Sequence, residues 1–153
     1  MASSVMQNLP REVSSPSRKT SSKPSLDSRR QTHALLSIRP PYAEAIFRGE
    51  KRFEFRRAIF RKEVEVVVVY ISSPISMVAG EFDVKHVISD DVASLWERTH
   101  SKAGIDSDGF FKYFAGREVG YAIAIGDVRR YVKPLELEAH YGVRAPQSFL
   151  YLR

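Results

Sequence analysis

The sequence contains no cysteine, which excludes disulfides, thiolate metal sites and cysteine nucleophiles. The four histidines are scattered and none pairs with another at the spacing of metal ligands, so no metal site is expected. No apolar run approaches the roughly 20 residues that a membrane span needs. A glycine-rich phosphate loop is also missing, and no motif argues for a flavin, nicotinamide or nucleoside triphosphate. We therefore expect a cytoplasmic protein that uses neither a metal nor a cofactor and does not enter a membrane.

Positive charge is concentrated in two segments of the chain. The formal net charge is +6, of which residues 1–33 contribute +4 and residues 34–153 contribute +2. Within the second part, the segment 39–62 holds eight Lys/Arg against three Glu, a net of +5, so the remaining residues sum to −3. A local positive field attracts polyanions and accelerates their encounter. The distribution favours an anionic partner at 39–62, and solvated surface charge is the alternative.

The first 33 residues differ from the rest in composition. They contain nine serines, three prolines and almost no periodic apolar residues. Such a segment buries too little apolar surface to offset the entropy of ordering, so we predict a disordered basic tail over 1–33. An organelle transit peptide, a basic tethering arm and a misassigned start site are equally compatible with it. The second part, 34–153, is predicted to be a single domain.

Hydrophobic periodicity in 34–153 predicts strands interspersed with short helices. The predicted strands are 34–38, 51–57, 64–73, 74–89, 119–132 and 148–153. The predicted helices lie within 40–50, 91–100 and 107–115. Gly49 and Gly116 are placed to end the first and the last of these helices. This pattern indicates an α+β fold in which five to six strands form a small mixed β-barrel with two to three flanking helices.

The basic stretch 49-GEKRFEFRR-57 lies directly after the first predicted helix. Side chains of an extended strand alternate between its two faces. Phe53 and Phe55 therefore share one face and are expected to anchor the strand to the core. Lys51 and Arg57 stand at the two ends of that row.

Three charged residues, Arg52, Glu54 and Arg56, occupy the opposite face of the same strand, which we expect to be open. In one interpretation Glu54 pairs with its neighbouring arginines and keeps an edge strand soluble. In the other, Glu54 orients a guanidinium for an anionic or nucleotide ligand, because the planar fork of arginine matches a phosphate. The residues alone leave both interpretations open.

A few polar and aromatic residues elsewhere are candidates for contacts with a base. Gln147 and Ser148 lie in a turn just before the last predicted strand and have side chains that can hydrogen-bond a base edge. Tyr70, Tyr121 and Tyr151 can stack on a base, although strand tyrosines also belong to hydrophobic cores. Local backbone bonding is the alternative role for Gln147 and Ser148.

The spacing Gly49-x-Lys51-x-x-Glu54-x-Arg56, preceded by 42-YAEAIFRGEK-51, resembles the signature of the ASCH domain family. The segments 79-AGEFDV-84, 119-VGYAIAI-125 and 145-APQSFLY-151 resemble a subgroup of predicted transcriptional regulators with PUA-like domains. The resemblance covers essentially all of 34–153. It implies a PUA-like barrel with a cleft lined by Lys51, Glu54 and Arg56, and RNA or a modified nucleotide as the ligand. Arg52 and Arg57, together with the turn 147–148, would extend that nucleic-acid interface.

Some members of the family are enzymes, among them an N-acetylcytidine amidohydrolase and single-strand-specific ribonucleases. The amidohydrolase motif uses a lysine, a threonine three residues later and a downstream glutamate. Lys51 matches the lysine, but Glu54 stands at the position of the threonine, so the hydroxyl is missing. The segment 101-SKAGID-106 offers no carboxylate before Asp106. These departures speak against deacetylation.

We therefore expect an RNA- or nucleotide-binding module with a basic cleft and a regulatory role. The alternative is a small metal-independent hydrolase that acts on RNA or a modified nucleoside, with Lys51 and Glu54 as its catalytic pair. A third reading is an interaction module whose cleft binds a peptide or an acidic protein partner.

Overall fold

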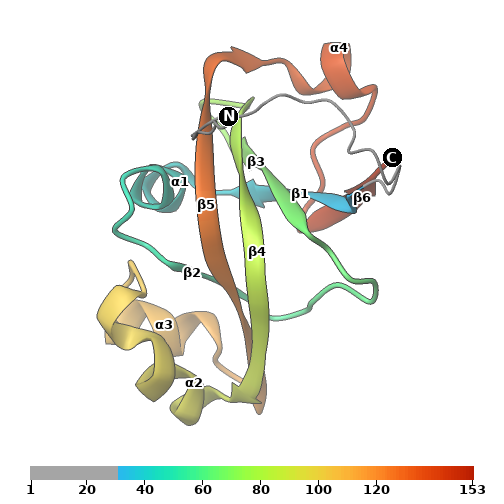
Figure 1. The fold of residues 1–153 in the computed structure, drawn as a ribbon. Coiled ribbons are helices and arrows are strands. Elements are labelled where there is room, and N and C mark those ends of the chain that lie inside the picture. The colour runs from blue at the N-terminus through green and yellow to red at the C-terminus, as the bar shows by residue number, and fades with distance from the viewer. Residues whose placement is uncertain (1–30) are drawn as a thin grey trace, which may run out of the picture. The chain divides into compact units, whose positions relative to one another are not determined.

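The computed structural model describes residues 31–153, so the predicted tail lies outside the described residues except for its last three positions. Figure 1 shows the arrangement of the elements. The strands are β1 (His33–Ile38), β2 (Phe53–Arg56), β3 (Val66–Ile71), β4 (Met77–Asp91), β5 (Val119–Leu135) and β6 (Phe149–Leu152). The helices are α1 (Pro40–Phe47), α2 (Val92–Thr99), α3 (Ser107–Tyr113) and α4 (Leu137–Tyr141), with a 3-10 turn η3 (His100–Lys102).

All six strands belong to one mixed sheet in the order β2-β5-β4-β3-β1-β6. β1 and β3 are parallel, and the other neighbouring pairs are antiparallel. This confirms the predicted α+β class and the predicted strand number. The expectation of a closed barrel needs correction, because β2 and β6 remain the two edges of the sheet and no ladder joins them in the described chain.

The two longest strands, β4 and β5, form a long antiparallel pair that carries the rest of the sheet (Figure 1). We call this pair the hairpin, although α2, η3 and α3 lie between its strands in the sequence. β2 pairs with β5 between Phe53↔Ala124 and Arg56↔Tyr121. β3 pairs with the first half of β4, from Met77 to Asp83. The β4–β5 register shifts between these two regions, and such bulges increase the local bend and twist of a strand. β2 and β3 therefore flank different halves of one bent hairpin.

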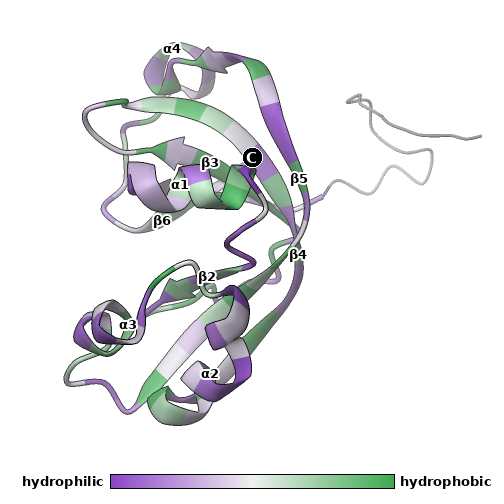
Figure 2. Ribbon diagram, turned by 90° about the vertical axis from the view of Figure 1, so that its left-hand side faces the viewer, coloured by the Kyte–Doolittle hydropathy of each residue, from purple (hydrophilic) through white to green (hydrophobic). Residues whose placement is uncertain are grey.

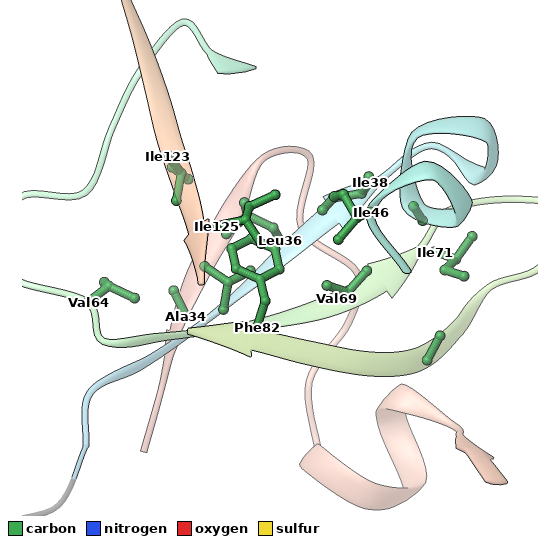
Figure 3. Close-up of a cluster of buried hydrophobic side chains, with 13 residues drawn as sticks. Ala34, Leu36, Ile38, Ile46, Val64, Val69, Ile71, Phe82, Ile123 and Ile125 are labelled. Carbon is green, nitrogen blue, oxygen red and sulfur yellow. The ribbon is translucent and has the colours of Figure 1, made fainter. Parts of the chain in front are cut away.

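The main hydrophobic core lies between α1 and the inner face of the sheet. Leu36, Ile46, Phe82 and Ile123 are fully buried in it, and Figure 3 shows them converging from four different elements. α1 begins at consecutive prolines, which suit a first helical turn because their missing N–H groups need no partner there. Its buried face, which includes Ala43 and Ile46, packs on this core.

A second core lies under α2 and α3, at the other end of the hairpin. Phe55 of β2 makes edge-to-face contacts with Phe110 and Phe114 at centroid distances of 5.0 and 6.2 Å. Phe53 packs against the same cluster, so both phenylalanines anchor β2 as predicted. Figure 2 shows β2 between α1 and β6 on one side and α3 on the other. β2 therefore lies against the second core and contributes both of its phenylalanines to it.

The last helix, α4, was missed by the sequence patterns, which placed only an irregular connection before the final strand. It has five residues and covers a third cluster around Leu35, Tyr70 and Leu137. A helix this short shows less than two turns of periodicity, so the pattern carries little signal. Gly49 and Gly116, in contrast, have φ values of +81° each and follow α1 and α3 as predicted.

Candidate functional site

The basic stretch begins where α1 turns into β2. The backbone N–H groups of Glu50 and Lys51 both donate to the carbonyl oxygen of Ala45, at 2.9 and 3.1 Å. Gly49 takes the positive φ that this turn requires. Five residues, 48–52, connect the end of α1 to β2, and Lys51 and Arg52 are the last two of them. Lys51 is thereby fixed against the C-terminal half of α1.

The side chain of Lys51 is buried, with only 3% of the residue exposed. Its Nζ donates to the carbonyl oxygen of Ala103 at 2.7 Å and lies 4.8 Å from the ring centroid of Phe55 and 5.3 Å from that of Tyr42. Burial lowers the pKa of Lys51, and the negative charge of Glu54 opposes this shift. The amine is therefore held in one place and gives up its proton more readily than an exposed lysine.

Gly104 closes the other side of the Lys51 side chain. Its φ is +69°, and a Cβ at this position would lie 2.6 Å from both Cβ and Cγ of Lys51. Real Cβ atoms do not approach other carbons this closely, so only glycine fits. The loop after η3 therefore covers the aliphatic part of the Lys51 side chain.

Glu54 and Arg56 form an ion pair on the opposite face of β2, with Arg56 Nη1 3.0 Å from Glu54 Oε2. Their side chains are only 8% and 10% exposed. The expectation of an open, solvated face is therefore wrong. The start of β6 covers Arg56 in part, because Ser148 accepts hydrogen bonds from its guanidinium. The prediction that Glu54 pairs with a neighbouring arginine is confirmed for Arg56.

Arg56 also joins the two edges of the sheet. Its Nη2 donates to the carbonyl oxygen of Ser148 at 3.2 Å and to Ser148 Oγ at 2.8 Å. Ser148 is itself held against β1, because its carbonyl oxygen accepts the backbone N–H of Ser37 at 3.2 Å. We call this side-chain junction between β2 and the start of β6 the seam. Gln147 lies beside it and is exposed.

The other two arginines of the stretch point away from the seam. Arg52 Nη2 donates to the carbonyl oxygens of Ile125 and Gly126 at 2.6 and 3.1 Å and so ties the start of β2 to β5. Arg57 is exposed, and its guanidinium carbon lies 5.1 Å from the ring centroid of Tyr113. The structure thus places Lys51, Glu54 and Arg56 around one strand, with Arg52 and Arg57 at its two ends. The assignment of all of them to a nucleic acid stays a prediction.

Two tyrosines at this site were not identified from the sequence. Tyr42 of α1 lies over Lys51, and Tyr113 of α3 donates its hydroxyl to the carbonyl oxygen of Phe55 at 3.2 Å. Burial raises the pKa of Tyr113. Both tyrosines occur at apolar positions of amphipathic helices, where a core role is the simpler interpretation. No signal in the sequence separates them from ordinary core residues.

The tyrosines proposed for base stacking are all engaged within the fold. Tyr70 is 9% exposed and packs in the cluster under α4. Tyr121 lies opposite Arg56 in the β2–β5 ladder. Tyr151 Oη accepts the backbone N–H groups of Arg61 and Lys62 at 2.8 and 3.3 Å.

No helix among residues 31–153 is long and apolar enough to cross a membrane. No group of three or more His, Asp or Glu side chains in the same range is arranged to hold a metal ion.

Buried charge is therefore the property that distinguishes this site. Lys51, Glu54 and Arg56 are the three charged residues in the buried class among residues 31–153, and they lie within six positions of one another. Burying a charge costs free energy unless the charge is paired and hydrogen-bonded. Two cations against one carboxylate leave an excess positive charge, which suits an anionic ligand and a proton-transfer role for Lys51.

The sequence model of the ASCH domain family matches residues 36–141. A curated protein from Zymomonas mobilis, named ASCH domain-containing ribonuclease, is 30% identical over 125 residues, which cover 78% of this chain and 84% of that protein. ATP synthase subunit alpha of Ureaplasma parvum is also 30% identical, over 120 residues, but the match spans only 15% of its length.

Solved structures of the ASCH protein from Zymomonas mobilis share the fold. One of them superposes with a TM-score of 0.73 and 28% identity, and the match covers 79% of this chain and 87% of that chain. A serine-to-alanine mutant of the same protein gives a TM-score of 0.72. On the match to more than half of its length, this chain belongs to the ASCH domain family.

Proposed function

We propose that this protein binds single-stranded RNA at the seam, with Lys51 and Arg56 contributing the positive charge and Glu54 orienting the guanidinium of Arg56. The observation that carries the proposal is the clustering of the buried charges of residues 31–153 in one six-residue stretch. Keeping three charges out of water at one place costs free energy. Because these three leave a positive excess, the binding of an anion offsets part of that cost. The regulatory role implied by the resemblance to transcriptional regulators is part of the same proposal.

RNA is favoured among anionic ligands by two facts. A relative that matches most of this domain is named a ribonuclease. The turn that precedes β6 also places the exposed Gln147 next to Arg56 and Ser148, where an amide side chain can bond a base edge while the cations contact the backbone. We therefore assign Arg56 to a phosphate contact, and Gln147 and Ser148 to the base. Lys51, whose Nζ is bonded to Ala103 inside the fold, adds positive charge behind the seam.

Binding of a short fluorescent single-stranded RNA across a salt series tests this proposal. The wild-type affinity should fall with salt, because each phosphate contact to a single strand contributes a slope of about −0.7 in log K against log salt. Arg56→Gln and Lys51→Gln should weaken binding. Arg48→Ala is the matched control, because it removes a cation close by that is exposed and already paired with Glu50. Salt-independent binding, or equal losses in the control, would overturn the proposal.

Cleavage of RNA is the second candidate, and the lowered pKa of Lys51 is the observation that favours it. A buried amine that loses its proton readily can accept the proton of an attacking 2′-hydroxyl, while Arg56 neutralises charge on the phosphate. The 2′-oxygen then bonds the phosphorus, the P–O5′ bond breaks to leave a 2′,3′-cyclic phosphate, and the leaving 5′-oxygen takes the proton back from the ammonium or from water. Deacetylation of N-acetylcytidine has less support, because Glu54 replaces the threonine and is committed to Arg56.

A charge-conserving substitution separates cleavage from binding. Lys51→Arg keeps a cation that does not deprotonate in proteins, so it should abolish product formation while leaving affinity for a non-cleavable RNA within a few-fold of wild type. Products from unstructured RNA and from N-acetylcytidine are read by mass spectrometry. A protein that binds RNA but yields no product from either substrate is a binding module, and cleavage is then rejected for them.

A further inference from the structure

Four cationic side chains among residues 31–153 lie over aromatic rings. Two of them differ from the others because they are exposed and have no carboxylate partner within that range. Lys51 is buried between two rings, and Arg130, which lies 4.8 Å from the Phe47 ring, is neutralised by two hydrogen bonds of 2.9 Å to Glu44. Arg57 and Lys62 are exposed, and each lies over a tyrosine. Within residues 31–153, no carboxylate is within ion-pair distance of either.

Arg57 is held at the end of β2 by the helix beside it. Its guanidinium carbon is 5.1 Å from the Tyr113 ring centroid, and the Tyr113 hydroxyl bonds the carbonyl oxygen of Phe55, two residues earlier. A third cation, Arg117, reaches the same place, with Nη1 3.5 Å from the carbonyl oxygen of Arg57. Two exposed arginines therefore lie at the end of β2, and within residues 31–153 neither has a carboxylate at ion-pair distance.

Lys62 lies between β2 and β3 in the sequence and is held in the same manner against the other edge strand, β6. Its Nζ lies 4.9 Å from the ring centroid of Tyr151 in β6, and its own backbone N–H donates to the hydroxyl of that tyrosine at 3.3 Å. The neighbouring Arg61 N–H donates to the same oxygen at 2.8 Å. One tyrosine thus fixes both the backbone and the head group of Lys62.

We infer that Arg57 and Lys62 are two phosphate-binding positions on either side of the seam, so that one RNA strand crosses the seam and is held at both flanks. The inference rests on the proposed function and adds the path of the strand. Arg57 follows one sheet edge and Lys62 lies against the other, and Arg56 joins the two edges between them. Stacking on a tyrosine orders each long side chain before a ligand arrives, which reduces the entropy lost on binding.

The proposed path predicts that substitutions of Arg57 and Lys62 weaken binding of an oligonucleotide but not of a single nucleotide. Arg57→Ala and Lys62→Ala should each weaken binding of a six-nucleotide oligouridylate about twofold to fivefold, as for other exposed ion pairs. Each should make the negative slope of log K against log salt shallower by about 0.7, and the double variant should make it shallower by about twice that. Binding of uridine monophosphate, which reaches only the seam, should not change.

Matched variants decide what the loss means. Arg130→Ala removes an aromatic-stacked cation that already has a carboxylate partner, and it should leave both ligands unaffected. Arg57→Lys and Lys62→Arg keep the charge and should retain the salt slope.

Four results would overturn the inference. If wild-type protein binds no RNA, the proposed function fails and this inference fails with it. If wild type binds RNA but the oligouridylate slope is unchanged in the Arg57/Lys62 double variant, only the path is wrong. Equal losses in Arg130→Ala would show a general charge effect. Displacement of the RNA by polyglutamate at equal charge concentration, with no preference for RNA, would indicate an acidic protein partner instead.

Discussion

The buried ion pair between Glu54 and Arg56 gives the sharpest stability prediction. At the observed 3.0 Å, two unit charges attract each other by about 5.5 kcal/mol at an effective dielectric constant of about 20. Replacing Glu54 by leucine removes this attraction and leaves the guanidinium buried. Arg56 keeps its two hydrogen bonds to Ser148, which offset part of the loss. We expect Glu54→Leu to lower the free energy of unfolding by about 3 kcal/mol, near the lower end of the range for broken buried pairs.

Removing the second charge should reverse most of this loss. In Glu54→Leu/Arg56→Met neither charge of the pair remains, while Lys51 is still buried and lacks Glu54 in both variants alike. Apolar replacements of a buried pair are often neutral or stabilising, so at least about 2 kcal/mol should be recovered. Urea unfolding followed by circular dichroism measures both variants, with the m-value as a check on two-state behaviour. The double variant should fold well and yet fail to bind RNA.

An exposed pair of the same geometry serves as the control. Arg48 and Glu50 are also two residues apart, and their Nη2–Oε1 distance is also 3.0 Å, but their side chains are 55% and 61% exposed. Glu50→Leu should not change the unfolding midpoint measurably, because water screens this pair. The reasoning is refuted if Glu54→Leu costs no more than Glu50→Leu, or if the double variant is as unstable as Glu54→Leu alone.

Three further predictions concern the frame around the site. Gly104→Ala should destabilise by more than Gly142→Ala in urea unfolding, since both have φ of +69° and share a strain of about 1–2 kcal/mol, but only the first Cβ overlaps Lys51. Because burial lowers the pKa of Lys51 below its ordinary 10.5, the unfolded chain binds that proton more tightly, and stability should rise as pH increases from the lowered pKa towards 10.5. Tyrosines titrate in the same pH range, so the stability profile of Lys51→Met is subtracted from that of wild type to remove their contribution. The rise should be present only in wild type. Asp106→Ala removes the side-chain acceptor of the Gly109 N–H at the start of α3 and should cost about 1 kcal/mol by the same assay.

The elements of the fold were predictable because their signals are local. The alternation in β2 predicted that Phe53 and Phe55 would face the core, and the structure confirms it. Gly49 and Gly116 marked helix ends correctly, because a positive φ selects glycine over short distances in sequence. Strand order and the open edges were not predictable in this way, since they depend on pairings between distant segments.

The candidate site was only half predictable, for the same reason. The sequence proposed Lys51, Glu54 and Arg56 as candidates but did not predict their burial, because Ser148 lies 92 positions from Arg56 and no local pattern indicates that the two side chains meet. The direction of Arg52, which bonds the carbonyl oxygens of Ile125 and Gly126, follows from the β2–β5 pairing and not from alternation alone. Tyr113 was missed because its partners, Phe55 and Arg57, come from another part of the chain.

The seam ties ligand binding to the stability of the sheet. Within the described chain, β2 and β6 share no backbone ladder, so the side chain of Arg56 takes on the role that a ladder has in a closed barrel. A phosphate accepts hydrogen bonds from a guanidinium better than a serine hydroxyl does, because its oxygens are charged. A ligand at the seam therefore competes with Ser148 for Arg56.

If the phosphate replaces Ser148, the start of β6 loses a contact and its amide hydrogens should exchange faster. If the phosphate joins Ser148, the strand edges are held more firmly and exchange should slow. Hydrogen exchange at Phe149–Leu152 with and without oligouridylate distinguishes the two, and no change in either direction would place the RNA away from the seam.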